Sequence, residues 1–563
     1  MASTSIYKVY PSELTDIADA IREKANISGS IRYPDEFISR INQFGKYTLE
    51  DIMYKSIYSL SDDKVTYLPQ NCITPFSAIS YVNFPVCSYI GHNAVMNCES
   101  LQSASFPACK YIGGGAFARC SLLSSIEFPA CSYIESYAFQ SCTSLSLINF
   151  PVCGYIGSWA FQSCSSLTSA DFPACSYIDF EAFDWCSLLA SISFPVCEYV
   201  GEYAFRSCSS LTSISFPACS YIGNYAFSSC KSLVSIDFPV CEYISNGAFY
   251  NCTSLPTVSF SVCSYIANEA FRYCTGLTSV SIQSCSYIGN YAFCYCPSLS
   301  LISLPVCSYI GSSAFLQCSA LTSIGSPVCE YIGSNAFQSC ISLSSVNFPA
   351  CNYIGSSAFD GCVSLTTVNF QSCGYIGTGA FSNCSSLSEA SFPVCSFIGL
   401  SAFDGCVSLT TVNFQSCGYI GTGAFYNCKS LVSISSPVCS YIGLSAFAYC
   451  LSLSYANLRD CKSIFNGVFY SCIALSTVIL SSCTSISSSA FNGCSKLMSL
   501  YLMRNRIVSL GNKNAFYNTP MSKSTYTGSF GSIYVPASLV NSYKTATNWS
   551  TYSARITSIP EES

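Results

Sequence analysis

Apolar residues return along most of this chain with a period of 22 residues. We count positions from the leucine that opens each unit, so that Leu211 is position 1 of a representative unit. The opening L-x-x-I-x-F pattern predicts a short strand, and the later A-F-x-x-C segment predicts a single helical or 3-10 turn on the opposite side. The recurrent apolar residues of this unit, at positions 1, 4, 6, 9, 12, 16, 17 and 20, are Leu211, Ile214, Phe216, Cys219, Ile222, Ala226, Phe227 and Cys230.

Nineteen such units follow one another from residue 79 to residue 496 without an insertion or a deletion. One coil of 22 residues cannot bury its apolar side alone, whereas stacked coils bury it against each other. We therefore predict an α/β repeat solenoid, with short parallel strands on one side and helical or 3-10 turns on the other. Gly223 at position 13 is expected to allow a tight turn, and Pro217 at position 7 to end the strand.

The regions outside the repeats are predicted to lead into the solenoid and to close it. Residues 1–50 have the apolar spacing of two short helices, and residues 51–78 form the lead-in. Residues 497–563 begin with a degenerate repeat and continue with a pattern typical of strand, helix and strand. This last segment is expected to cover the open edge of the final coil.

Forty cysteines invite a disulfide or a metal interpretation, but their spacing favours neither. From Cys87 to Cys494 a cysteine stands at every eleventh residue, and only Cys72 and Cys294 lie off this lattice. Cysteine side chains that repeat along a stack run parallel to one another, which is poor disulfide geometry. A zinc site needs a C-x-x-C pair near a second such pair or near histidines, and the chain has no such cluster. We expect core thiols, which imply assembly in a reducing place. In the representative region these are Cys197, Cys208, Cys219 and Cys230.

The L-x-x-I-x-F-x-x-C opening matches the leucine-rich-repeat pattern. The whole unit resembles the BspA-like, or Treponema-type, repeats of bacteria, their phages and some protozoa, over about three-quarters of the chain. The resemblance is carried by the motifs FP-x-C, Y-I-G and A-F-x-x-C-x-x-L. It implies a binding or adhesion role, because the family is defined mainly by surface adhesins and unassigned proteins. One example of these motifs comprises Phe194, Pro195, Cys197, Ala204, Phe205, Cys208 and Leu211.

Residues 1–50 contain ELTDIADAIREK and YPDEFISRI, which resemble a segment at the start of phage tail-associated proteins of gut Firmicutes. That resemblance implies a module that attaches the solenoid to a larger assembly. A cap on the first coil is the alternative interpretation, and the two are compatible. No charged segment followed by an apolar stretch marks a secretory signal at the N-terminus.

Composition argues against most enzymes and against several kinds of partner. Only 9% of the residues are charged, the net charge is −6, and no Lys/Arg cluster indicates nucleic acid binding. No run of apolar residues is long enough to span a membrane. A nucleophile needs a base with its orienting partner, but the chain has one histidine, His92, which we interpret as an ordinary surface residue.

Asp360 and Asp404 are carboxylates two coils apart, a spacing of about 10 Å that an inverting glycosidase could use. They belong to identical segments, 357–381 and 401–425, so the pair follows from a duplication. No phosphate-binding glycine motif occurs. We therefore expect no enzymatic activity, no metal and no cofactor.

Two sets of side chains are candidates for a binding surface, and for each a structural interpretation stands beside the functional one. Position 11 holds an aromatic column, almost all tyrosine, which either contacts a ligand or fixes the register of the coils. Positions 14, 15, 18 and 19 vary most, which is typical of a specific surface or of tolerated drift. The column is represented by Tyr199, Tyr221, Tyr243, Tyr265, Tyr287 and Tyr309, and the variable positions by Trp185, Arg206, Tyr250, Arg272, Tyr273 and Tyr295.

These features favour a non-enzymatic adhesion protein of a phage tail or virion, assembled in the bacterial cytoplasm, that recognises a bacterial surface polysaccharide or protein. Residues 1–50 would then contact other virion proteins. The alternatives are a BspA-like adhesin that is secreted or lies on the bacterial cell surface, and an architectural protein that forms a fibre or lattice. The sequence leaves open whether copies of the chain associate.

Overall fold

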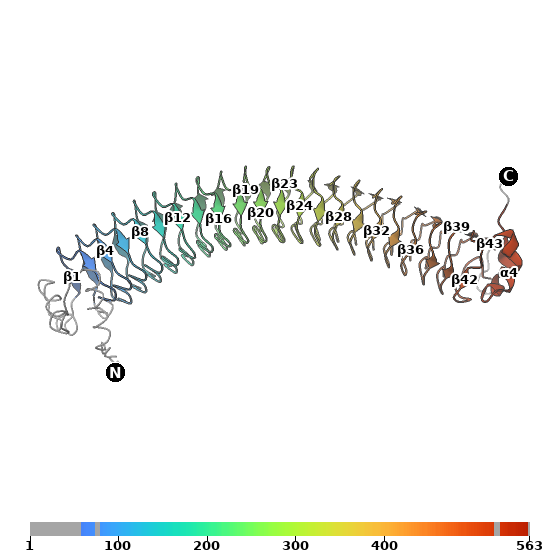
Figure 1. Cartoon of the computed structure of the whole chain (residues 1–563), viewed down its shortest axis with the longest axis horizontal. Coiled ribbons are helices and arrows are strands. Elements are labelled where there is room, and N and C mark those ends of the chain that lie inside the picture. The colour runs from blue at the N-terminus through green and yellow to red at the C-terminus, as the bar shows by residue number, and fades with distance from the viewer. Residues whose placement is uncertain (1–57, 74–78, 523–529, 561–563) are drawn as a thin grey trace, which may run out of the picture. The chain divides into compact units, whose positions relative to one another are not determined.

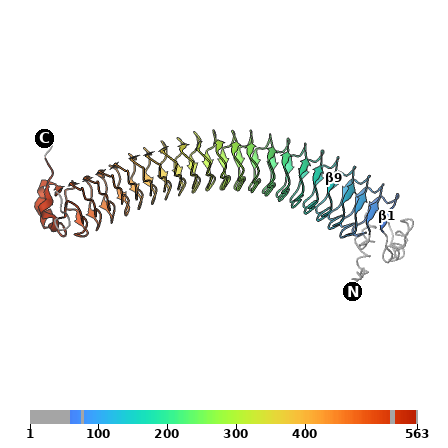
Figure 2. The same ribbon diagram turned by 180° about the vertical axis from the view of Figure 1, so that it is seen from behind.

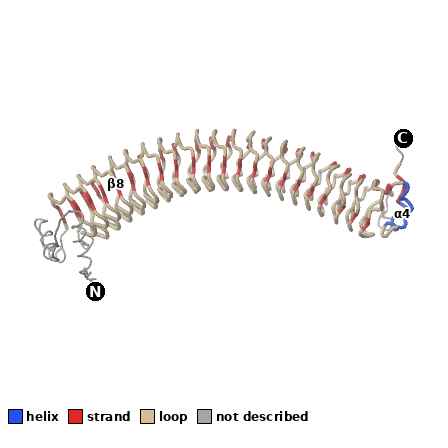
Figure 3. Tube along the Cα trace, viewed as in Figure 1, coloured by secondary structure: helices blue, strands red, loops and turns tan. Residues whose placement is uncertain are grey.

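The computed structural model describes residues 58–73, 79–522 and 530–560, and the predicted helices of residues 1–50 lie outside them. The chain separates into two compact units, residues 1–277 and residues 278–563. Figures 1 and 2 show the coils of each unit from opposite sides, and Figure 3 shows that strands and loops make up nearly all of them. Each unit is a stack of parallel coils, which confirms the predicted leucine-rich-repeat solenoid.

Every complete coil contains two short strands, one at positions 3–5 and one at positions 11–12. The shorter strands pair in parallel from coil to coil, whereas the longer strands pair in parallel within several separate groups of neighbouring coils. Thus Ser213 pairs with Ser235, and Tyr199 pairs with Tyr221. The longer strands of the first unit are β1 (Ser59–Ser61), β3 (Tyr81–Asn83), β5 (Ser103–Ser105), β7 (Ser125–Glu127), β9 (Leu147–Asn149), β11 (Ser169–Asp171), β13 (Ser191–Ser193), β15 (Ser213–Ser215), β17 (Ser235–Asp237) and β19 (Thr257–Ser259). The shorter ones are β2 (Tyr67–Leu68), β4 (Tyr89–Ile90), β6 (Tyr111–Ile112), β8 (Tyr133–Ile134), β10 (Tyr155–Ile156), β12 (Tyr177–Ile178), β14 (Tyr199–Val200), β16 (Tyr221–Ile222), β18 (Tyr243–Ile244) and β20 (Tyr265–Ile266).

The second unit repeats this arrangement. Its longer strands are β21 (Ser279–Ser281), β23 (Leu301–Ser303), β25 (Ser323–Gly325), β27 (Ser345–Asn347), β29 (Thr367–Asn369), β31 (Glu389–Ser391), β33 (Thr411–Asn413), β35 (Ser433–Ser435), β37 (Tyr455–Asn457), β39 (Thr477–Leu480) and β41 (Ser499–Leu502). The shorter ones are β22 (Tyr287–Ile288), β24 (Tyr309–Ile310), β26 (Tyr331–Ile332), β28 (Tyr353–Ile354), β30 (Tyr375–Ile376), β32 (Phe397–Ile398), β34 (Tyr419–Ile420), β36 (Tyr441–Ile442), β38 (Ser463–Ile464), β40 (Ser485–Ile486) and β42 (Ser509–Leu510).

The last described segment of the second unit packs onto its final coil. Strand β43 (Ser532–Val535) pairs with β41, and β44 (Ile556–Ser558) pairs with β43. Between them lie the 3-10 helix η1 (Ala537–Leu539), the helix α4 (Val540–Thr545) and the 3-10 helix η2 (Trp549–Arg555). Trp549 is buried, and its Nε1 donates a hydrogen bond to the Val508 carbonyl at 2.6 Å. This anchor fixes the helical segment over the end of the apolar core.

The side of the coil opposite the longer strand differs from the prediction in one respect, because positions 14–19 form consecutive turns and no helix. Positions 15 and 19 are left-handed, as in Tyr225 (φ 53°) and Ser229 (φ 62°). The backbone amides of positions 16, 18 and 20 donate hydrogen bonds within their own coil. For example, the Ser228 amide donates to the Tyr225 carbonyl at 3.0 Å. Those of positions 15, 17 and 19 bond to the next coil, as from Phe227 to the Ala248 carbonyl at 2.8 Å. Every amide of positions 15–20 is thereby satisfied, which offsets the cost of two left-handed residues in each coil.

Ladders of identical residues fill the core. The Phe227 ring stacks on the Phe205 ring at 5.3 Å and meets the Phe216 ring of its own coil at 5.8 Å. Gly223 at position 13 lies close against the preceding coil and has no left-handed backbone, so it does not serve the tight turn that the sequence suggested. A Cβ atom there would lie 2.5 Å from the backbone carbon of Gly201.

The lattice cysteines, including Cys197, Cys208, Cys219 and Cys230, are buried with free thiols. The Cys219 thiol donates to the Tyr221 carbonyl at 3.1 Å, and the Cys230 thiol donates to the Phe205 carbonyl of the preceding coil at 3.2 Å. Burial raises the pKa of Cys219 to about 11 and that of Cys208 well above its usual range. These protonated thiols fill space that a larger apolar side chain would overfill.

Candidate functional site

The tyrosine column at position 11 runs through both units and is more evenly spaced in the second. Ring centroids of successive coils lie 4.6 to 6.1 Å apart in the first unit and 4.6 to 4.9 Å apart in the second. Tyr199 stacks on Tyr221, Tyr243 stacks on Tyr265, and Tyr287 stacks on Tyr309. A column that continues through both units fixes the register of the coils, but it marks no particular place on the surface.

The turn side of the first unit carries a second set of aromatic side chains, which we call the aromatic row. Tyr137 stacks on Trp159 at 4.6 Å, and Tyr203 stacks on Tyr225 at 5.4 Å. The other contacts in the row are edge-on, at 4.9 to 6.1 Å. The row comprises Tyr137, Trp159, Phe180, Tyr203, Tyr225, Tyr250 and Tyr273.

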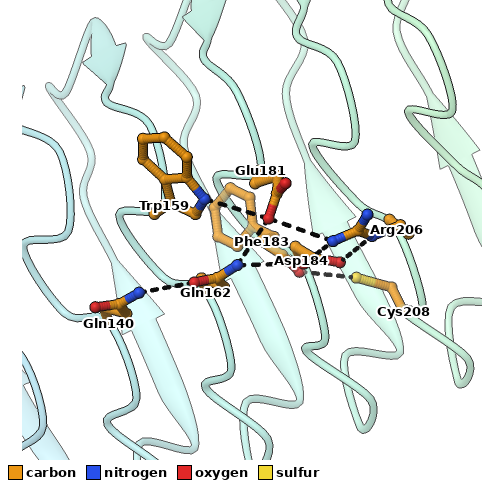
Figure 4. Close-up of polar contacts among 8 residues, drawn as sticks. All are labelled: Gln140, Trp159, Gln162, Glu181, Phe183, Asp184, Arg206 and Cys208. Atoms are coloured by element: carbon orange, nitrogen blue, oxygen red, sulfur yellow. Dashed lines mark hydrogen bonds and ion pairs between the residues drawn. The ribbon is translucent and has the colours of Figure 1, made fainter.

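A polar network lies beneath the first part of this row (Figure 4). Arg206 donates to both carboxylate oxygens of Asp184, from Nε at 2.9 Å and from Nη2 at 2.6 Å, and Nη2 also contacts Glu181 at 3.3 Å. Asp184 is fully buried. Trp159 donates from Nε1 to Glu181 at 3.2 Å, so the network also orients an indole of the row. Gln162, in the same coil as Trp159, donates from Nε2 to Glu181 at 2.7 Å, so the network joins three coils.

Opposing charges shift the pKa values in this network. Asp184 is the main cause that raises the pKa of Arg206. Burial, together with hydrogen bonding and repulsion from Asp184, raises the pKa of Glu181. The Arg206 guanidinium contacts both carboxylates, Asp184 and Glu181. These contacts hold the side chains in one geometry before a ligand binds. Such order lowers the entropic cost of binding.

A second clamp holds the far part of the row. Arg272 donates to Glu269 at 2.7 Å and lies over the Tyr273 ring, 4.9 Å from its centroid. The Tyr225 hydroxyl donates to the same Glu269 carboxylate at 3.1 Å. Tyr250 and Tyr273, two residues that the sequence singled out, therefore lie in one ordered cluster with Arg272. Trp185 is 57% exposed on the same side.

A pocket of about 700 Å³ opens on the turn side at the coil of residues 101–122, and we call it the notch. This coil contributes the small residues Gly114, Gly115 and Ala118, at positions where other coils carry larger side chains. The preceding coil lines the notch with His92 and Asn93, and the following coil lines it with Tyr137 and Gln140. The notch adjoins the aromatic row, since Tyr137 belongs to both.

His92 lies at the notch and is not an isolated surface residue. Its Nδ1 is 3.1 Å from Oε2 of Glu135, and the amide of Gly114 donates to the same oxygen at 2.7 Å. The Tyr111 hydroxyl donates to the other carboxylate oxygen. Glu135 is thus fully engaged in holding two coils and His92 together, and it is not poised as a free base.

The turn side of the second unit carries a shorter set of aromatic side chains, in which Tyr449 meets Tyr426 and Tyr470 edge-on at 5.3 and 5.5 Å, and it has no arginine clamp among the described residues. At position 15 glycine or serine replaces the aromatic residues in most coils, as in Ser357, Gly379 and Gly423. Asp360 accepts hydrogen bonds from Gln338 at 3.0 Å and from Asn383 at 3.2 Å. Burial raises the pKa of Asp404. Tyr295, another residue that the sequence singled out, lies in this unit, at the left-handed position 19 of its first coil.

Across the described residues there is no group of three or more His, Cys, Asp or Glu side chains placed to hold a metal ion. The described helices are all too short or too polar to cross a membrane.

The profile of the family described as "BspA type Leucine rich repeat region (6 copies)" matches residues 9–124, 110–218, 198–322, 308–432 and 418–537. The chain belongs to this BspA-type leucine-rich-repeat family. Members of this kind are repeat proteins suited to binding. A search of curated proteins finds no match.

Among solved structures, this BspA-type chain is similar to a leucine-rich repeat protein from Bacteroides ovatus, with 23% identity, a TM-score of 0.34, and coverage of 75% of this chain and 82% of that one. It is also similar to a leucine-rich repeat protein of T. pallidum, with 28% identity and a TM-score of 0.24 over 30% of this chain and 78% of that one. A third is a leucine-rich cell surface protein from Faecalibacterium prausnitzii, with 18% identity and a TM-score of 0.20 over 77% and 86%. With such low TM-scores, these likenesses support no argument about a ligand or a role.

Proposed function

We propose that this BspA-type chain is a binding and adhesion protein, and that the turn side of its first unit is the surface that contacts the partner. The observation that carries the proposal is the difference between the units. The same coil and the tyrosine column run through both units, whereas the aromatic row, its two arginine clamps and the notch all lie between residues 92 and 273.

Ordered aromatic side chains with polar neighbours suit recognition. Tyrosine and tryptophan offer a large amphipathic area for little loss of side-chain entropy. Here Trp159 is fixed by its hydrogen bond to Glu181, and Tyr203 lies under the Arg206 guanidinium, 4.5 Å from it. A surface needed only to hold such coils together would be expected to repeat in the second unit, which is built from the same coil.

The test compares the binding of labelled full-length chain to cell envelopes from a panel of Firmicutes and Bacteroides species. The variant Y203S/Y225S removes two rings from the row and leaves the notch intact. Serine is natural at position 15 with the same left-handed backbone, as in Ser313 (φ 56°) and Ser401 (φ 51°), so the variant should fold. We expect binding to at least one envelope and a loss of at least tenfold in the variant.

The matched control is Y426S/Y449S, which removes two exposed turn-side tyrosines from the second unit. It should bind as tightly as the unaltered chain. Equal losses in the two variants, or no binding to any envelope, would refute the proposal.

We propose two settings for this role, a bacterial surface and a phage virion, and the turn-side surface suits both equally. The attachment role of residues 1–50 remains a prediction, since they lie outside the described residues. Immunogold labelling of producing cells and of particles from the same culture separates the settings. Label on tail structures indicates a virion-associated adhesin, and label on the cell envelope indicates a bacterial one.

A further inference from the structure

The aromatic row begins with a ring that has one open face. Trp159 covers one face of Tyr137, with ring planes only 10° apart. Among the described residues Tyr137 has no other ring neighbour, because the preceding coil has Gly115 at the equivalent position. Gly115 keeps the left-handed backbone of that position (φ 64°) but provides no side chain. The open face of Tyr137 therefore borders the notch.

The size of this gap suits one ring. Neighbouring coils of parallel strands are about 4.8 Å apart, so the coils on either side of Gly115 are separated by about 10 Å. That is room for one ring stacked on Tyr137. The Asn93 amide oxygen lies directly over Gly115, where a Cβ atom would collide with it. A ligand ring would thus lie between an aromatic face and an amide.

The remaining lining residues indicate the chemistry of that ring. Asn93 and Gln140 place amides beside Tyr137, a combination that matches a sugar, which has an apolar ring face and hydroxyl groups around its rim. A nucleic acid strand is disfavoured because it brings a phosphate with every nucleotide, whereas the lining of the notch has a single arginine, Arg119. An apolar peptide side chain is disfavoured because Met96 and Ala118 are the only aliphatic residues of the lining.

Arg119 adds a charge preference. It lines the notch, it is exposed, and it makes no ion pair with another described residue. Glu135 also lines the notch, and it already accepts hydrogen bonds from the Tyr111 hydroxyl and the Gly114 amide. We propose that the notch binds a single sugar ring of a glycan, stacked on Tyr137, and that a carboxylate on this sugar pairs with Arg119. This inference rests on the proposed binding function and names its ligand class.

The test uses the full chain and methyl glycosides of glucose, galactose and mannose together with the corresponding uronates. Binding is detected by saturation-transfer NMR, and affinity is measured from the fluorescence of Trp159, which stacks on Tyr137. At least one uronate should bind. The variant G115Y is made together with N93S, so that its Cβ atom does not meet the Asn93 amide oxygen and the preceding coil carries serine as it does before Gly379. It fills the gap with the side chain that the next coil carries at this position, so binding should fall at least tenfold relative to N93S.

The matched control G379Y makes the same substitution at a left-handed glycine of the second unit (φ 61°), and it should bind like the unaltered chain. In R119Q, uronate binding should fall about tenfold to the level of the neutral sugar, a difference of about 1.4 kcal/mol. Failure of every glycoside to bind, or equal effects of G115Y and G379Y, would overturn the sugar site. Uronate binding that ignores R119Q would overturn the carboxylate contact. Envelope binding that depends on Tyr203 and Tyr225 but not on Gly115 would sink this inference and leave the proposed function standing.

Discussion

The two units are built from the same coil, yet their turn sides are different surfaces. In both, most positions that point into the core are apolar, and the tyrosine column runs through the coils. Position 6 differs, because the buried Ser326 and Ser436 of the second unit stand where the first unit has phenylalanine. The first unit adds aromatic rings, two arginine clamps and a notch, while the second keeps glycine and serine at most of these positions. Residues that repeat in every coil therefore serve folding in this chain. Residues that break the repeat are the better candidates for a specific function.

The largest effect should be the same in both units, because it concerns the core. F227A and F381A each remove a fully buried ring that stacks on a ring in each neighbouring coil, at 5.3 and 5.5 Å for Phe227 and at 5.1 and 5.2 Å for Phe381. Each should lower the free energy of unfolding by about 3–5 kcal/mol. Urea unfolding followed by circular dichroism measures both. Costs that differ by several kcal/mol would show that the two cores are not equivalent.

A smaller effect should be confined to the first unit. R206M leaves Asp184 buried without its bidentate partner, which should cost about 3 kcal/mol. The counterpart in the second unit, D404N, alters a partly buried carboxylate and should cost less than about 0.5 kcal/mol. Both are measured by urea unfolding.

The network also offers a rescue of R206M. Gln140 and Gln162 occupy position 18 in the two coils that precede the coil of Asp184, and Gln140 donates a hydrogen bond to Gln162 at 2.7 Å. D184Q/R206Q would extend that glutamine ladder and should recover most of the lost stability. If the double variant is as unstable as R206M, the cost does not come from the unpaired carboxylate.

The period of the apolar residues was sufficient to predict the stacking, the register and the buried cysteines, because each depends on what lies 22 residues away. It was not sufficient for the turn conformation. The A-F-x-x-C spacing is compatible with a helical turn. A left-handed backbone is not expected at residues such as Tyr225 or Trp159, so these positions gave no sign of it. A comparison of position 15 across the units, where asparagine, glycine and serine are frequent, carried the missing signal.

The candidate site was predicted only in part. Arg206, Tyr250, Arg272 and Tyr273 were recognised as unusual members of their columns, but their partners were not. Asp184 and Arg206 are one coil apart, and Glu181 and Arg206 are 25 residues apart. Which neighbouring coil a side chain leans toward is decided by packing and leaves no mark in the sequence. The notch was not predicted, because it is formed where one coil has glycine and alanine in place of larger side chains.

Glycine substitutions test whether close contact between coils is common to both units. G157A and G377A would each place a Cβ atom 2.6 Å from a backbone atom of the preceding coil and should cost about 1–3 kcal/mol. G154A and G374A, three residues earlier in the same coils, meet no atom closer than 3.9 Å and should be nearly neutral. Thermal unfolding of the four variants measures the contrast. Similar costs at both kinds of position would mean that glycine is not required by coil spacing.

The smallest effect is the dependence of stability on pH that arises from Glu181. The pKa of Glu181 is raised in the folded chain by burial and by Asp184, so the folded state takes up a proton more readily than the unfolded state. Its contribution to stability is fully present below the unfolded pKa, about 4.3, and is lost as the pH rises through the folded value. E181Q removes this titration. Near neutral pH we expect the variant to match the unaltered chain to within about 1 kcal/mol, because the lost attraction to Arg206 is offset by relief of repulsion from Asp184. On acidification, the unaltered chain should gain stability relative to E181Q, as followed by thermal unfolding with Trp159 fluorescence. A constant difference between the two at every pH would mean that Glu181 is ionised alike in the folded and unfolded chains, and the network would then hold both carboxylates without strain.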